Sequence, residues 1–144
     1  MGVLTDFVAA TRAEAQRVCD SDNPSREFSG LEAKGIDTVK LGTLHAILTG
    51  TEFDPSFIPG DPLASGGDDG PWVIEVPADL VKRLAALDTE QIREAAMKWA
   101  KTEEFSPEHD NWPPEIVHDV LYDIADLCVK AIVARKNVLM WMSL

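Results

Sequence analysis

Residues 44–50, with the sequence Leu-His-Ala-Ile-Leu-Thr-Gly, place a histidine inside an otherwise apolar helical turn. Apolar residues before and within this segment recur at spacings of three and four, which predicts a helix that ends at Thr49. Gly50 follows at the position where helices favour a left-handed residue. An imidazole among aliphatic neighbours needs partners for both ring nitrogens. We therefore expect a polar group of the following loop to hold His45, either as a structural strut or as part of a binding site.

The loop that follows, residues 51–71, contains four prolines and a cluster of glycines. A loop of this length is uncommon unless it has a function or wraps part of the core. Four apolar residues indicate wrapping: Phe53, Phe57, Ile58 and Leu63. The Gly-Asp run at 66–70 lacks the Lys-Ser/Thr ending of a phosphate loop and the spaced acidic residues of a calcium loop. We interpret this run as a solvated loop.

Length and composition fit one domain that covers residues 1–144, with 45% hydrophobic and 26% charged residues. Three apolar segments are expected to be strands, at 3–10, 72–76 and 138–142. Helices are expected at 12–20, from 37 or 38 to 49, at 77–87, at 90–101 and at 114–135. These elements predict an α+β fold, in which four to five helices pack on a small mixed sheet of about three strands.

Acidic residues outnumber basic ones by 25 to 13, which leaves a formal charge of −12. Nucleic acid and anionic membrane surfaces repel so negative a chain, so we expect neither as a partner. The same charge permits a basic protein as the partner, and the alternative is an acidic surface that only keeps the protein soluble. The sequence has no apolar run of about 18 residues and no basic segment before an apolar one at its start, so we expect neither a membrane span nor a secretory signal.

Cys19 and Cys128 fall in separate predicted helices, far apart in the sequence. They indicate buried thiols of a reduced cytoplasm rather than a disulfide framework, so we expect a cytoplasmic protein. The three histidines share no spacing that favours a metal site. No serine lies in a Gly-x-Ser-x-Gly setting. We expect neither a metal nor a cofactor.

A candidate pocket lies where His45 and Thr49 meet the loop at 53–63. Asp54, in this loop, is the carboxylate that we expect beside the histidine. Trp112 stands in a polar, proline-containing segment, where an aromatic ring can form the rim of a pocket rather than part of the core. These four residues are the predicted binding residues.

The leading hypothesis is a binding or interaction module without catalytic activity, which could neutralise a basic partner as immunity proteins do. The first alternative is an enzyme acting on a small polar molecule, with His45 as general base and Asp54 as the carboxylate that orients it. The second alternative is a structural homo-oligomer. Its apolar contact would follow the strand of Trp141, if that strand lies at a sheet edge.

The chain resembles the YfbM-like family of small bacterial proteins of unknown function. Residues 44–50 resemble the family's helix-ending Leu-His-Phe-x-Leu-Thr-Gly signature, with Ala46 where a bulkier residue is typical. The Met-Gly start with its strand, the Asp-Pro-Leu at 61–63, the strand and helix at 72–87 and the C-terminal apolar strand follow the family's order. The resemblance implies a bacterial protein with one compact domain of helices and strands. It implies no activity and no catalytic residues.

Overall fold

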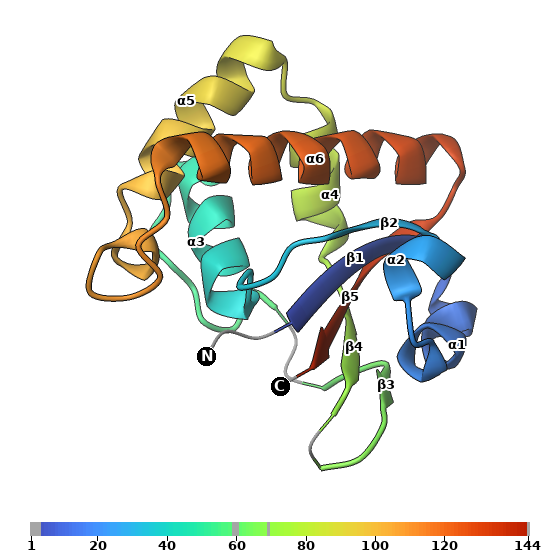
Figure 1. Ribbon diagram of the computed structural model, residues 1–144. Coiled ribbons are helices and arrows are strands. Elements are labelled where there is room, and N and C mark those ends of the chain that lie inside the picture. Colours follow the sequence, from blue (N-terminus) through green and yellow to red (C-terminus); the bar gives the residue numbers. More distant parts are fainter. Residues whose placement is uncertain (1–3, 59–60, 69, 144) are drawn as a thin grey trace.

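The protein folds around one antiparallel sheet in the computed structural model, which describes residues 4–58, 61–68 and 70–143 (Figure 1). The order of the described strands across the sheet is β2-β1-β5-β4-β3. Their bounds are β1 Leu4–Ala10, β2 Ser29–Glu32, β3 Ala64–Ser65, β4 Trp72–Glu75 and β5 Asn137–Ser143. The described helices are α1 Ala15–Asp20, α2 Pro24–Glu27, α3 Thr38–Thr49, α4 Ala78–Ala85, α5 Thr89–Ala100 and α6 Pro114–Val133, with short 3-10 turns at Arg12–Glu14 and Glu103–Phe105.

The α+β class is confirmed, but the predicted sheet was too small and of the wrong kind. The described sheet has five strands rather than about three, and every pair of neighbours is antiparallel rather than mixed. β5 pairs with β1 on one side and with β4 on the other. The strand that carries Trp141 is therefore central, and an oligomer contact along a free edge of this strand is ruled out.

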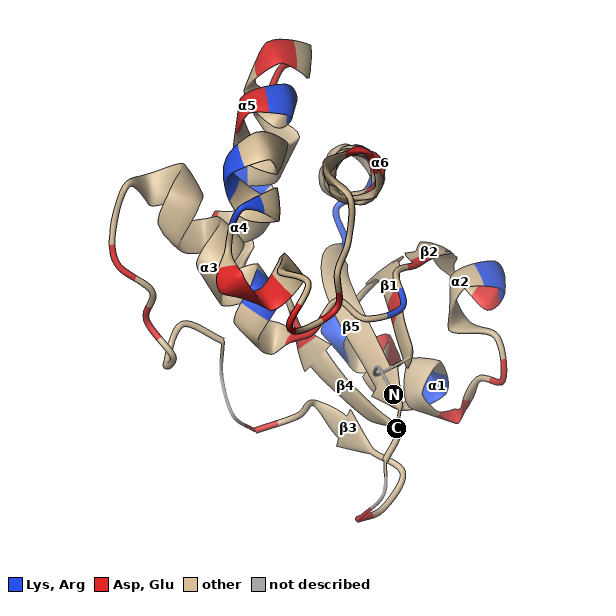
Figure 2. Cartoon of the chain, turned by 60° about the vertical axis from the view of Figure 1, so that its left-hand side comes forward, with Lys and Arg blue, Asp and Glu red and all other residues tan. Residues whose placement is uncertain are grey.

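Helices cover both faces of the sheet (Figure 2). Side chains of β1 alternate between the two faces. Phe7 joins the larger core under α3, α4, α5 and α6, while Val8 joins the smaller core with α1 and with Phe28, which follows α2. Both faces of β1 are buried, which explains why its sequence is apolar over most of its length.

The ends of α3 follow the sequence signals. The Asp37 carboxylate accepts a hydrogen bond from the backbone N–H of Lys40 at 2.9 Å, which caps the first turn. Gly50 has a φ of 67° and ends the helix in the left-handed conformation that its position predicted. The helix expected between 37 or 38 and 49 is thus confirmed at both ends.

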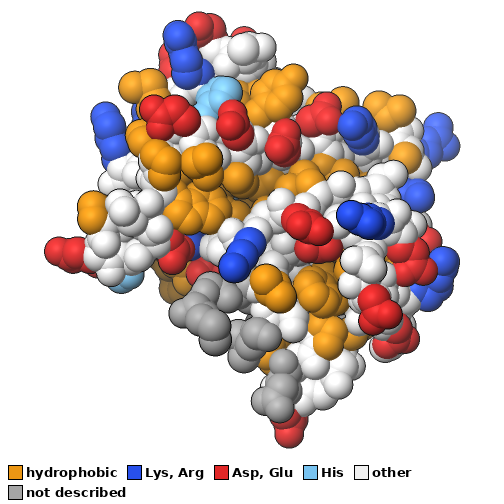
Figure 3. Space-filling model, viewed as in Figure 1, with side chains coloured by type: hydrophobic (Ala, Val, Ile, Leu, Met, Phe, Trp, Pro, Cys, Tyr) orange, Lys and Arg blue, Asp and Glu red, His pale blue; other side chains and the backbone are white. Residues whose placement is uncertain are grey.

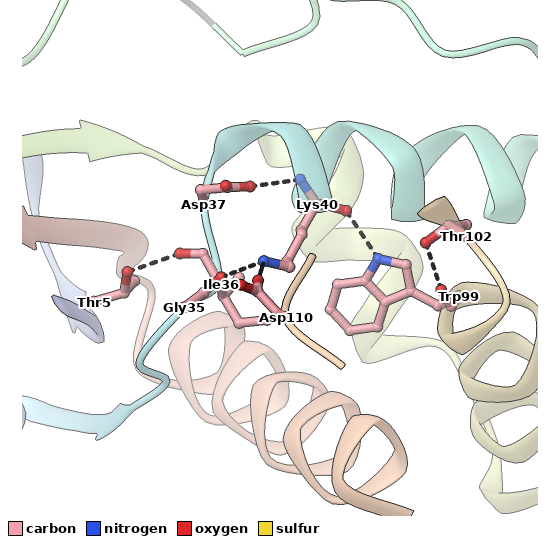
Figure 4. A network of polar contacts seen from close by, with 8 residues as sticks. All are labelled: Thr5, Gly35, Ile36, Asp37, Lys40, Trp99, Thr102 and Asp110. Carbon is pink, nitrogen blue, oxygen red and sulfur yellow. Dashed lines mark hydrogen bonds and ion pairs between the residues drawn. The ribbon is translucent and has the colours of Figure 1, made fainter. Parts of the chain in front are cut away.

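A buried lysine fixes the N-terminal end of α3 (Figure 4). Lys40 is 3% exposed, and its Nζ donates to the carbonyl oxygen of Gly35 at 2.7 Å and pairs with Asp110. The indole N–H of Trp99 in α5 donates to the Lys40 carbonyl at 3.0 Å. Because these bonds join α3 to α5 and to the segment before α6, the start of α3 is held in place beside the sheet.

Candidate functional site

A groove of about 910 Å³ lies between the first half of α3, the segment that follows this helix and the β3–β4 hairpin. We name it the α3 groove. The following residues line it: Thr38, Val39, Gly42, Phe53, Asp54, Pro55, Ile58, Pro62, Ser65, Gly67, Asp68, Trp72, Ile74 and Met142.

The sheet contributes the apolar residues Trp72, Ile74 and Met142 to this groove. Trp72 and Ile74 are two residues apart in β4, so their side chains point to the same face. Met142 of β5 is the direct partner of Trp72 in the strand register and shares that face. Ile74 and Met142 also contact the larger core. The groove thus continues the apolar face of the sheet beyond the area that α6 covers.

The ring of Phe53 packs directly against the backbone of α3 at Gly42. A Cβ added at Gly42 would come within 2.7 Å of Cε1 of Phe53, so the close approach depends on the glycine. Phe53 remains 43% exposed although it contacts the helix. Of the predicted loop anchors, Phe57 and Ile58 pack against the core, while Phe53 and Leu63 stay partly exposed. One side of the groove is therefore an aromatic ring that a ligand can contact.

The charged residues among those that line the groove, Asp54 and Asp68, are both acidic. One carboxylate oxygen of Asp54 accepts hydrogen bonds from the hydroxyl of Ser56 at 2.7 Å and from its backbone N–H at 2.9 Å. These two bonds hold the pKa of Asp54 below its usual value. On the described part of the segment between α3 and β3, Figure 2 shows acidic positions and no basic ones. The groove is therefore suited to a positive charge.

His45 lies outside this groove and binds a carboxylate of another helix. Its Nε2 lies 2.8 Å from Oδ2 of Asp79 in α4, and the same oxygen accepts a hydrogen bond from Nε of Arg83, also at 2.8 Å. The bond from Arg83, and after it the bond from His45, lowers the pKa of Asp79. The expectation that the loop supplies this polar partner was wrong. The loop contributes Phe57 instead, whose ring stacks on the imidazole with 3.7 Å between the centroids.

The four predicted binding residues do not form one pocket. Asp54 lines the α3 groove, whereas the Thr49 hydroxyl donates to the His45 carbonyl one helical turn earlier at 2.9 Å. Trp112 lies beside Phe105, with ring centroids 5.2 Å apart, and 5.8 Å separate the centre of its ring from Nζ of Lys40. Trp112 therefore belongs to the surroundings of the buried lysine and not to the α3 groove.

Sequence reasoning missed Trp72 and Met142 as groove residues. Both stand in segments that were expected to be apolar strands, and a strand sequence does not show where the helices that cover it end. Two tryptophans in apolar segments can carry the same sequence signal, so only the packing separates a core ring from a groove ring. Trp72 is partly exposed, whereas Trp99 is fully buried.

Over the described residues, no group of three or more His, Cys, Asp or Glu side chains is arranged to hold a metal ion. Cys19 and Cys128 are free and buried. Burial raises the pKa of the Cys128 thiol to about 12, so this sulfur is not activated as a nucleophile. No helix in the described part of the chain has the length and apolar character needed to cross a membrane.

The chain is similar to YfbM from Escherichia coli, a protein of unknown function with a known crystal structure. The match has 20% sequence identity and a TM-score of 0.45, and it covers 98% of this chain and 99% of the other. No protein-family model and no curated protein matches the chain. This match assigns no activity to the chain.

Proposed function

We propose that this protein is a binding module without catalytic activity and that the α3 groove is its binding site. The groove holds an apolar or aromatic group that carries a positive charge. The observation that carries this proposal is the combination of exposed aromatic surface with charged lining residues that are all acidic.

The size and composition of the groove support a ligand of this kind. Its volume of about 910 Å³ lies within the range of small-molecule sites, which are mostly apolar with a few placed polar groups. The rings of Phe53 and Trp72 supply apolar area and a face that attracts a cation. Asp54 and Asp68 supply the opposite charge. A ligand with an aromatic body and an ammonium group uses all three features.

The charge of the whole chain supports the same preference. A net charge of −12 raises the local concentration of cations and speeds the approach of a basic partner. A lysine beside an aromatic side chain on a basic protein presents the same chemistry as a small aromatic amine, and an immunity-like role requires such a protein partner. A cytoplasmic location is part of the proposal, supported by the free, buried thiols of Cys19 and Cys128.

The contacts of His45 support a binding role over the enzyme alternative. Asp79, which binds Nε2 of the imidazole, also binds Arg83, and Phe57 covers one face of the ring. A general base must reach the proton of a bound substrate. His45 is not among the residues that line the α3 groove, and the carboxylate beside it is Asp79 rather than the Asp54 that the enzyme hypothesis named.

Calorimetric titration with two probes of matched shape and opposite charge tests the proposal. We expect phenethylamine to bind the wild-type protein and phenylacetate to bind at least about tenfold more weakly, a difference of about 1.4 kcal/mol. The Asp54→Asn/Asp68→Asn double variant should lose most of this preference. The Phe53→Ala variant should weaken the binding of phenethylamine.

The matched control is the Asp20→Asn/Asp22→Asn double variant, which removes the same charge at exposed positions by α1, on the opposite face of the sheet. This variant should retain the preference for the amine. Equal binding of the two probes, or an equal loss in the control, would show that the groove does not select a cation. Binding that is unaffected by Phe53→Ala would place the ligand elsewhere.

A further inference from the structure

Among the described strands, β2 has a neighbour on one side only. β2 is the outermost strand next to β1, and Ser29, Gly30 and Glu32 are exposed. In Figure 1, β2 runs beneath α6, and α2 precedes it in the chain. An exposed strand edge presents main-chain donors and acceptors that another strand can bind.

The strand register identifies which main-chain groups of β2 are free. The N–H of Ala33 donates to the carbonyl of Thr5 at 2.8 Å, and the register places Leu31 opposite Phe7. Residues in an antiparallel pair alternate between hydrogen-bonded and non-hydrogen-bonded positions. Leu31 therefore faces β1 with its N–H and C=O. The same groups of Gly30 and Glu32 point away from the sheet, at a spacing that an added strand can match.

A groove of about 540 Å³ runs along this edge, between residues 25–31 and α6. We name it the β2 groove. Four residues of α6 line it at helical spacings of three and four: Asp123, Asp126, Leu127 and Lys130. Figure 3 shows apolar side chains along the lower side of α6, below a row that includes acidic side chains. An edge strand beside a helix is the arrangement by which several domains bind extended peptides.

The charges of the β2 groove favour a basic occupant. The residues that line it include three acidic ones, Glu27, Asp123 and Asp126, and two basic ones, Arg26 and Lys130. Nζ of Lys130 is already bound to Asp126 at 2.9 Å. The groove is thus acidic on balance, as is the whole chain at −12. Two copies of this chain joined edge to edge would bring like charges together, which disfavours self-association.

We propose that the β2 groove is a docking site for an extended, basic segment of a partner protein. The segment pairs with the free groups of Gly30 and Glu32 as an additional strand of the sheet. Alternate side chains of the segment contact Leu31 and Leu127, and basic side chains lie near Asp123. This site is separate from the α3 groove and does not depend on the function proposed for it.

A synthetic peptide of alternating lysine and valine, blocked at both ends, tests the proposal by NMR titration of the full chain. We expect the amide signals of Gly30 and Glu32 to shift and their hydrogen exchange to slow. A peptide of the same sequence with alternate main-chain nitrogens methylated should bind much more weakly, because it lacks the donors for strand pairing. A matched peptide of alternating glutamate and valine should not bind.

Charge-reversal variants separate the groove from general attraction to an acidic protein. Asp123→Lys should weaken the binding of the lysine–valine peptide about fivefold, because one exposed attraction becomes a repulsion. Asp119→Lys makes the same change of charge on α6 outside the groove. This variant should weaken the binding of the peptide less than twofold. Equal losses in the two variants would overturn the proposal. So would unchanged Gly30 and Glu32 signals, equal binding of the methylated peptide, or a wild-type dimer that pairs through β2.

Discussion

The imidazole of His45 lies flat on the ring of Phe57, with the ring planes 13° apart. Phe57 belongs to the segment that borders the α3 groove, and His45 lies in the last turns of α3. The stack therefore ties this segment to the helix. Asp79 of α4 also holds this imidazole in position, through Nε2.

Replacing His45 by alanine should lower the free energy of unfolding by about 1–2 kcal/mol, because the stack with Phe57 and the burial of the ring are lost. His45→Phe keeps an aromatic ring against Phe57 and should retain most of the stability. Urea denaturation followed by circular dichroism measures both changes. If the alanine variant is as stable as the phenylalanine variant, the stack does not hold the segment.

The Lys40–Asp110 pair should respond unequally to removal of its two members. Asp110→Ala leaves a buried ammonium without its carboxylate and should cost about 1–3 kcal/mol. Lys40→Met replaces the charge with an apolar chain of similar length and should cost less. In the methionine background, Asp110→Ala should have little further effect. A double-mutant cycle by urea denaturation tests this order, and additive losses would contradict the coupling.

Two glycines should resist substitution for different reasons. A Cβ at Gly30 would lie 2.2 Å from the backbone oxygen of Phe7, so Gly30→Ala must displace a strand, at a cost of about 1–3 kcal/mol. A Cβ at Gly50 meets no atom within 4 Å, but the φ of 67° disfavours alanine by about 1 kcal/mol. Thermal melts should rank Gly30→Ala as the less stable variant. The reverse order would contradict the close packing of β2 on β1.

The Asp79 carboxylate should stabilise the folded protein at neutral pH, and this contribution to the free energy of unfolding should be lost in acid. Its bonds to Arg83 and His45 lower its pKa in the folded protein. The unfolded chain therefore takes up the proton first as pH falls, and the stabilisation by the carboxylate is lost below about pH 4. Urea denaturation at several pH values should show a difference between wild type and Asp79→Asn that is constant near neutrality and shrinks in acid. A difference that grows in acid has the wrong sign for this carboxylate.

The thiols should be unreactive in the folded protein. Burial raises the pKa of both Cys19 and Cys128, to about 12 for the latter. Thiolate, which is the reacting form, is therefore scarce at pH 8. Ellman's reagent should label neither cysteine rapidly in buffer and both in denaturant. Rapid labelling of Cys128 without denaturant would mean that α6 detaches from the core.

The parts of the fold with strong local signals were predictable from the sequence. The α3 helix has a capping carboxylate at Asp37 and a glycine at its end. The apolar strands β1, β4 and β5 lie in the segments where the sequence predicts strands. β2 was missed, because Ser-Gly-Leu-Glu at 29–32 has neither apolar alternation nor branched side chains. β3 has two residues, which is too short for any periodicity.

The site was harder to predict because it depends on long-range packing. The sequence indicates that His45 needs a polar partner, but Asp79 lies 34 positions away in another helix, and no local pattern connects the two. Trp112 stands in a polar segment, yet its ring packs near the buried Lys40. The α3 groove joins a helix, a loop and three strands, so its existence follows from their packing rather than from a motif.

The most direct test of the central claim is an NMR titration of the full chain with phenethylamine, which locates the binding site residue by residue. The account predicts that the amide signals of Thr38, Gly42 and Ser65, which border the α3 groove, shift together and saturate with one dissociation constant. The indole signal of Trp72 should shift with them. Saturating shifts confined to other surfaces, or no saturating shifts in these residues, would contradict the assignment of the α3 groove as the binding site.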